Sequence, residues 1–165
     1  HEFLKGEYPY TINPGGPNHE ELVSLIGIHD YMMNLYAHHF DNIDISIRKK
    51  IEKINYLIQE HEEKIANPIL ELIYNQVNLN LIGKNKICNK NRAPTISFTS
   101  KNKTSKEVSQ HLVKNKIATR NDNFYAWRCL KALGIDVNDG VVRISLVHYN
   151  NLSEVNKLIE TLEKI

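Results

Sequence analysis

The sequence predicts an α+β fold, a two-layer sandwich in which a small, mostly antiparallel sheet carries helices on one face. From residue 77 onward, short strand-like runs alternate with amphipathic helical patterns in the order β, β, α, β, α, β, α. The chain has 165 residues, 41% hydrophobic and 24% charged, which suits one globular domain with an appendage. Two long helical patterns come before this region, and we expect them to be linking helices.

The first part of the chain is predicted to be irregular and then helical. Residues 1–17 are rich in proline and glycine, which excludes a regular helix. Asn18 is the predicted N-cap of a helix that ends near residue 36, with Glu21 as its capping-box partner.

A second, longer helix is predicted from about residue 44 to residue 75, because isoleucines recur along one face of it. Pro68 lies inside this pattern. We expect the helix to kink there, or to restart with Asn67 as its cap.

The remaining elements are assigned from alternation, capping and turn residues. Thr104 and Glu107 form a predicted capping box, as do Asn151 and Glu154. Strands are expected at 77–82, 93–99, 117–120 and 141–150, a turn at 121–123, and helices after Thr104, over 124–133 and after Asn151.

Composition narrows the classes of function. The net charge is +2, so neither nucleic acid nor a membrane is an expected partner, and no His, Cys and Asp set has the spacing of a metal site. Two isolated cysteines indicate a reducing compartment, which we take to be the cytoplasm. The chain does not begin with Met, so we expect it to start inside a longer protein or after removal of a tag.

Arg143 is the most informative single residue. It lies in the apolar run 141–150, where Val142, Ile144 and Leu146 alternate with it. A guanidinium in a strand cannot lose its proton, and its planar fork suits a carboxylate or a phosphate. From the strand alone, a structural ion pair is the simpler interpretation.

Four motifs in this order make a different interpretation of Arg143 the stronger one. They are Gly-Gly-Pro-Asn-His-Glu at 15–20, Arg-Ala-Pro-Thr-Ile-Ser-Phe at 92–98, Arg-Asn-Asp-Asn-Phe-Tyr-Ala at 120–126 and Val-Arg-Ile-Ser-Leu-Val-His-Tyr-Asn at 142–150. Together they resemble the C-terminal part of pyridoxal-phosphate enzymes of the class V aminotransferase group, with the cysteine desulfurase-like proteins as the most similar subgroup. The likeness covers roughly residues 12–165.

The resemblance implies an organisation of the chain. Residues 1–17 would be the tail of a large domain that this sequence lacks, residues 18–75 the linking helices, and residues 76–165 the small C-terminal domain of a fold-type-I pyridoxal-phosphate enzyme. The large domain of such enzymes supplies the Schiff-base lysine, so no catalytic residue is assigned here. We expect a homodimer when the protein is intact, and neither activity nor bound cofactor for the fragment alone.

The resemblance also implies roles for individual residues. Arg143 would grip the α-carboxylate of an amino-acid substrate, and Gly15 and Gly16 would lie near the cofactor phosphate of the neighbouring subunit. In the family a threonine stands where this chain has Gly16. From the residues alone, a tight turn before a helix cap is the preferred interpretation of the two glycines.

Further candidates for the substrate pocket are His148, Asn123 and Tyr125. His148 is equally well explained as a polar residue at the end of a strand.

The cysteines bear on the type of reaction. Some desulfurases carry a nucleophilic cysteine on the loop that residues 120–126 resemble, where this chain has Phe124 or Tyr125. Cys129 is expected to be a buried small hydrophobe, and Cys88 to lie in an exposed loop without a nearby base. Sulfur transfer is therefore in doubt, and transamination, a lyase reaction or epimerisation of an amino acid is at least as consistent with the sequence.

One alternative belongs to a different class of function. The chain would then be a free-standing α+β module that binds a small anionic metabolite or a partner protein, with Arg143 as its anchor.

Overall fold

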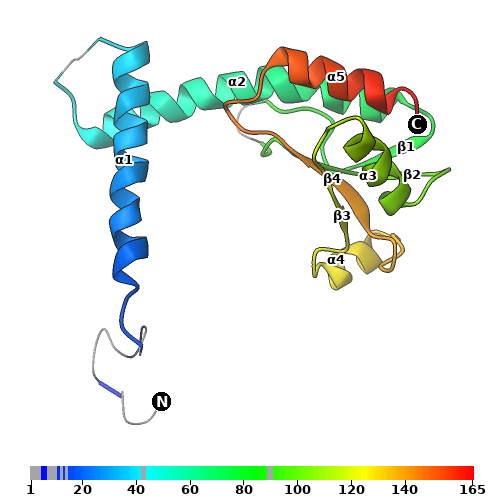
Figure 1. The fold of residues 1–165 in the computed structure, drawn as a ribbon, viewed down its shortest axis with the longest axis horizontal. Coiled ribbons are helices and arrows are strands. Elements are labelled where there is room, and N and C mark those ends of the chain that lie inside the picture. The colour runs from blue at the N-terminus through cyan, green and yellow to red at the C-terminus, as the bar shows by residue number, and fades with distance from the viewer. Residues whose placement is uncertain (1–4, 7–10, 12, 14, 42–43, 89–90) are drawn as a thin grey trace. The chain divides into compact units, whose positions relative to one another are not determined.

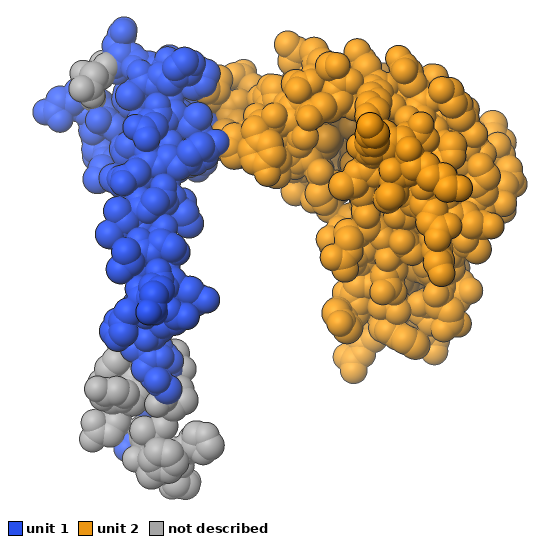
Figure 2. Space-filling view, in the orientation of Figure 1, with its two compact units in different colours: residues 1–56 blue, residues 57–165 orange. Residues whose placement is uncertain are grey.

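The chain divides into two compact units, residues 1–56 and 57–165, each considered by itself (Figure 2). The computed structural model describes residues 5–6, 11, 13, 15–41, 44–88 and 91–165. No helix within these ranges combines the length and the apolar character needed to cross a bilayer.

Five helices and four strands are described, with β1–β4 all in the second unit (Figure 1). In chain order they are α1 (His19–His39), α2 (Ile47–Asn75), β1 (Leu79–Ile82), β2 (Thr95–Ser100), α3 (Ser105–Lys114), β3 (Arg120–Asp122), α4 (Trp127–Ala132), β4 (Val141–Ser145) and α5 (Leu152–Leu162).

The strands form one sheet in the order β1-β2-β4-β3, and every neighbouring pair is antiparallel. This confirms the predicted α+β class. Because residues directly opposite each other point to the same side of a sheet, the register assigns every strand residue to one of two faces. Ile96 pairs with Ile144 and Phe98 with Val142, and these four side chains are buried.

The core lies between that face and the helices α2, α3 and α5. Its buried residues are Ile65, Ala66, Ile69, Leu70, Ile73, Leu79, Ile87, Ile96, Phe98, Val108, Leu112, Val142, Ile144, Leu146, Val155, Leu158 and Leu162. The two compact units divide inside α2, after residue 56, and the second half of that helix packs into this core.

Pro68 does not restart the helix. α2 runs without interruption from Ile47 to Asn75, so the predicted second start at Asn67 is wrong. Ile65 and Ile69 on either side of the proline are fully buried, and this packing offsets the hydrogen bond that proline cannot donate. The side chain of Asn67 instead bonds both backbone groups of Ile87, at 2.8 and 3.1 Å.

In the first unit, α1 begins as predicted. The side chain of Asn18 accepts a hydrogen bond from the Glu21 N–H at 3.1 Å. The helix ends at His39, one turn later than expected, and near its end Tyr36 stacks on Phe40 and lies under the Lys50 ammonium, which is 5.2 Å from the ring centroid.

Both predicted capping boxes of the second unit are confirmed. The Thr104 and Glu107 pair starts α3, and the Asn151 and Glu154 pair starts α5, with reciprocal side-chain to backbone bonds in each.

The carboxyl groups of these two capping boxes, on Glu107 and Glu154, should make the free energy of unfolding depend on pH. Hydrogen bonds from the Asn150 side chain and the Asn151 backbone lower the pKa of Glu154, and bonds from Thr104 lower the pKa of Glu107. A depressed pKa in the folded state stabilises the fold above the unfolded value, near 4.5, and that contribution is lost as the pH falls through the folded pKa. Urea unfolding should therefore show a lower midpoint at pH 3 than at pH 6.

Glu154→Gln removes one of these two titrating groups and should make the loss between the two pH values smaller. Glu160→Gln, at a position of α5 outside the capping box, is the matched control. An equal loss in the wild type and in Glu154→Gln would contradict the prediction.

Two predicted boundaries in the second half are wrong. Residues 121–123 were expected to be a turn, but Asn121 and Asp122 belong to β3 and pair with Val142 and Val141. The helix expected over 124–133 begins only at Trp127, because Phe124 and Tyr125 have positive φ values.

The strand expected over 141–150 is shorter as well. β4 ends at Ser145, and the chain then turns, with the Val147 N–H donating to the Asn150 side chain at 2.9 Å.

Candidate functional site

Arg143 occupies the middle of β4, an inner strand of the sheet. Ser97 on β2 and Arg120 on β3 are its direct cross-strand partners. Its neighbours along the strand, Val142 and Ile144, point into the core, so Arg143 points to the opposite side. We call that side the outer face, and it carries Asn80, Ile82, Thr95, Ser97, Thr99, Arg120, Asp122, Val141, Arg143 and Ser145.

Arg143 has no counter-ion among the residues that the structure describes. The ion pairs formed there join His29 to Asp30 and Arg48 to Glu52. The Nε atom of Arg143 is shielded from solvent and has no hydrogen-bond partner in the same set of residues. The structural ion pair that the strand alone suggested is therefore not formed within the described chain. A buried donor without an acceptor costs about 1–3 kcal/mol, so an anion that accepts a hydrogen bond from this N–H would remove that cost.

An aromatic ring contacts this guanidinium. The Arg143 Cζ lies 4.2 Å from the centroid of the Phe124 ring, which is the distance of a cation–π contact. Guanidinium donors act within their own plane, and that plane suits a planar acid group.

The loop that carries Phe124 has an unusual backbone. Phe124 and Tyr125 adopt φ values of 52° and 60° in succession, a conformation that costs non-glycine residues about 1–3 kcal/mol each. The Asn123 side chain holds the loop, since its Oδ1 accepts from the Tyr125 N–H at 3.0 Å and its Nδ2 donates to the Val137 carbonyl at 3.2 Å. Backbone strain of this kind is typical of functional sites.

The same contacts locate two predicted pocket residues. The amide of Asn123 is occupied by the loop itself. Tyr125 is 98% exposed, so its ring lies in solvent on this chain.

Gly140 allows β3 and β4 to approach closely at this point. Its φ is +71°, and a Cβ built on it would lie 2.2 Å from the backbone carbon of Asp122. The preceding residue, Asp139, caps α3 by accepting from the Ser105 N–H at 2.8 Å. Helix α3, the turn before β4 and strand β3 are thereby joined behind Arg143.

His148 lies in a different setting from Arg143. Its ring meets that of Tyr149 at 5.4 Å, edge to face. Burial raises the pKa of Glu62 on α2, and the nearby His148 and His61 oppose that rise. The His61 Nε2 is 2.8 Å from the Asn150 carbonyl, so these groups join α2 to the segment that follows β4.

Gly15 and Gly16 precede α1 in the first unit. Both are exposed, and a Cβ on either would meet nothing within 4 Å. The Gly16 N–H donates to the Asn13 carbonyl at 3.3 Å, and Gly16 has a φ of +76°. Tight-turn geometry is therefore present at these glycines.

The prediction for Cys129 is wrong. Its side chain is exposed on α4, because this helix has only six residues and buries only Leu130. Cys88 is half-buried, and its Sγ accepts a bond from the Asn91 amide at 3.4 Å.

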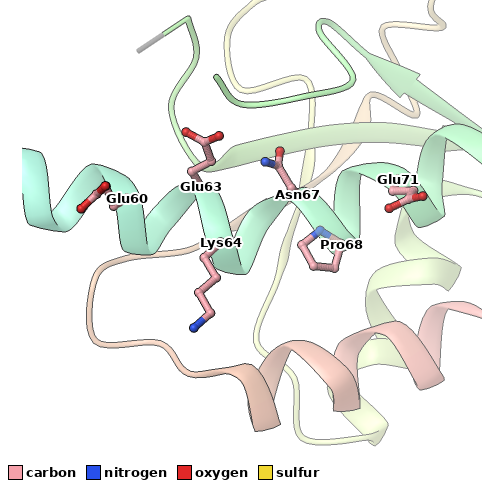
Figure 3. Close-up of a pocket in the computed structure, with 6 residues that line it drawn as sticks. All are labelled: Glu60, Glu63, Lys64, Asn67, Pro68 and Glu71. Carbon is pink, nitrogen blue, oxygen red and sulfur yellow. The ribbon is translucent and has the colours of Figure 1, made fainter. Parts of the chain in front are cut away.

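A hollow of about 510 Å³ lies along α2 in the second unit (Figure 3). Its lining comes from one helix and is formed by Glu60, Glu63, Lys64, Asn67, Pro68 and Glu71. No cluster of His, Cys, Asp and Glu in the described ranges has the geometry to hold a metal ion.

Sequence reasoning missed two members of the site around Arg143. Arg120 was read as the end of a strand and Phe124 as the start of a helix, and the structure brings both to Arg143. The antiparallel pairing of β3 with β4 was the missing information, because register alone decides which side chains face each other.

Comparison with known proteins supports the assignment of the fold. The aminotransferase class-V family matches residues 47–158. An aminotransferase-like protein, FGM3, of Gibberella zeae is 33% identical over 110 residues, which is 66% of this chain and 27% of that protein. The apo cysteine desulfurase of Thermococcus onnurineus NA1 superposes with a TM-score of 0.57 at 25% identity, over 72% of this chain and 29% of that one.

A NifS-like protein from Rickettsia africae ESF-5 has the same fold, with a TM-score of 0.56 at 19% identity over 70% of this chain and 30% of that one. The chain thus spans between about a quarter and a third of the length of the relatives that it matches. Since the family match covers most of the chain and includes β4 with Arg143, this chain belongs to the aminotransferase class-V family.

Proposed function

We propose that this chain is the C-terminal small domain of a pyridoxal-phosphate-dependent enzyme that acts on an amino acid, and that Arg143 binds the α-carboxylate of the substrate. The observation that carries the proposal is a guanidinium on an inner strand, in cation–π contact with Phe124, with a shielded Nε that has no acceptor in the described chain. A carboxylate satisfies such a fork with two parallel charge-assisted bonds. Binding of this kind orients the amino acid before reaction.

The proposal extends to the parts of the parent protein. Residues 1–17 are the tail of the large domain, residues 18–75 link it to the small domain, and residues 76–165 form the small domain. The parent acts as a cytoplasmic homodimer. This fragment alone is inactive, because the Schiff-base lysine belongs to the large domain.

The residues of this chain fit the cofactor in one respect. Gly15 and Gly16 are exposed beside the N-terminus of α1 and have no Cβ to block a phosphate. The Gly16 N–H already bonds Asn13, so the N–H of Gly15 and the positive end of the helix remain as attractive groups. We propose that they contact the phosphate of the partner subunit's cofactor. Bound pyridoxal phosphate supplies an electron sink for chemistry at the amino-acid Cα.

The type of reaction is the least constrained part of the proposal. Phe124 and Tyr125 occupy the loop where some desulfurases carry a nucleophilic cysteine. The Phe124 ring contacts Arg143, and neither Phe124 nor Tyr125 has a nucleophilic sulfur. We therefore favour transamination, a lyase reaction or epimerisation of an amino acid over sulfur transfer through a cysteine of this loop.

The test begins with the coding sequence upstream of His1. We expect an α/β region with a candidate Schiff-base lysine, and expect the longer protein to bind pyridoxal phosphate stoichiometrically and to consume an amino acid. The 165-residue chain alone should do neither. A start codon immediately before His1, or cofactor-dependent activity of the chain alone, would refute the proposal and favour the free-standing anion-binding module.

A further inference from the structure

The outer face of the sheet carries a second guanidinium opposite the first. Arg120 on β3 is the direct cross-strand partner of Arg143 on β4. Directly opposed side chains in an antiparallel pair point the same way, with Cβ atoms about 4.5–5.5 Å apart. Both arginines therefore stand side by side on the side of the sheet away from the core.

Nothing in the described chain neutralises this pair. Neither arginine forms an ion pair with a carboxylate there. On the other side of Arg143 the cross-strand partner is Ser97, which is neutral. Asp122 shares the outer face, but it pairs with Val141, and its Oδ1 accepts from the Asn123 N–H at 2.6 Å. Like charges directly opposite each other destabilise a sheet, so an anion that bridges them would relieve an unfavourable contact.

The two arginines differ in a way that suits two separate acid groups. Arg143 is half-buried and in contact with the Phe124 ring, whereas Arg120 is exposed on the edge strand. The half-buried guanidinium of Arg143 suits the α-carboxylate, which all amino-acid substrates share. The exposed guanidinium of Arg120 suits an acid group on the side chain of the substrate.

We infer that Arg120 is a specificity-determining residue, and that Arg120 and Arg143 together bind an amino acid with an acidic side chain, that is, a carboxylate, sulfinate or sulfonate. Arg143 takes the α-carboxylate and Arg120 takes the second acid group. The role of Arg143 rests on the proposed function, whereas the preference for a dianion rests on the register of β3 and β4.

The test is a titration of the 165-residue chain, followed by NMR through the Nε–H signals of its arginines. The probes are succinate, a dianion, and propionate, a monoanion of similar length, at equal ionic strength and neutral pH. We expect succinate to bind at least tenfold more tightly than propionate and to shift both Arg120 and Arg143. Arg120→Gln should reduce that preference to about twofold or less, because succinate binding falls much more than propionate binding.

Arg128→Gln is the matched control, because Arg128 is an exposed arginine of α4 and its loss changes the net charge equally. An amide spectrum of each variant verifies the fold. The inference is overturned if succinate shows no preference in the wild type, if Arg120→Gln keeps the preference, or if Arg128→Gln abolishes it as well. In those cases Arg120 is an edge-strand charge that only discourages aggregation.

The outcome is independent of the proposed catalytic function. The titration contains no cofactor, so a parent protein without enzyme activity would leave its result intact. Conversely, a parent that consumes neutral amino acids would support the proposed function while contradicting the role of Arg120. In an active parent, Arg120→Gln should lower kcat/KM for L-aspartate at least tenfold more than kcat/KM for L-alanine.

Discussion

Replacement of Arg143 by alanine in the proposed parent enzyme is expected to lower kcat/KM for an amino acid by about 100-fold or more. Loss of one partner of a hydrogen-bonded charge pair costs about 2–5 kcal/mol, and about 1.4 kcal/mol corresponds to a factor of ten. Arg143→Lys should recover only part of the loss, because an ammonium keeps the charge but lacks the planar fork. Steady-state kinetics and substrate titration measure both effects.

The stability of this variant provides a separate readout. The Nε of Arg143 bonds no described residue and Phe124 is its aromatic contact, so thermal unfolding of Arg143→Ala should lie close to the wild type. Arg128→Ala on α4 is the control for a general loss of positive charge. If Arg143→Ala bound the amino acid as tightly as the wild type, the carboxylate role would be excluded.

Gly140→Ala is expected to destabilise the fold strongly. The added Cβ would lie 2.2 Å and 2.3 Å from the backbone carbon and oxygen of Asp122, and 2.6 Å from the Asn123 nitrogen. These are main-chain atoms that cannot rotate away, so β3 must separate from β4. Overpacking of this kind costs about 1–3 kcal/mol, in addition to about 1–2 kcal/mol for a non-glycine residue at positive φ. Urea unfolding of the chain measures the sum.

Gly134→Ala separates these two contributions. Its φ of +70° matches the +71° of Gly140, but a Cβ at Gly134 would meet nothing within 4 Å. We expect it to lose only the conformational part, about 1–2 kcal/mol. Equal losses for the two variants would show that the close approach of β3 to Gly140 is absent in solution.

Much of the second unit could be predicted because its signals are local. The two capping boxes are encoded within four residues each, and Thr104 and Asn151 occupy the expected positions. Alternation along 141–145 correctly placed Val142 and Ile144 in the core and Arg143 on the opposite face.

The failures have causes that the periodicity of the sequence does not show. Phe124 and Tyr125 were included in a helix, but the bonds of Asn123 to the chain around it hold them at positive φ. Cys129 was placed in the core from its apolar neighbours, yet α4 is too short to bury a full face.

The continuity of α2 through Pro68 has the same kind of cause. Tertiary burial on both sides of the proline outweighs the local tendency of that residue to end a helix. Of Arg143, Arg120 and Phe124, the sequence predicted a site role for Arg143 alone, since the contributions of the other two depend on register and on the loop.

The two faces of the sheet differ in what a substitution on them would change. Ile96, Phe98, Val142 and Ile144 are locked in packing with three helices, so exchanges there alter folding. Arg120 and Ser145 on the outer face are exposed, and exchanges at such positions are usually tolerated within about 0.5 kcal/mol. Descendants of this chain can therefore acquire new ligand preferences by varying one face, while inheriting an unchanged scaffold from the other.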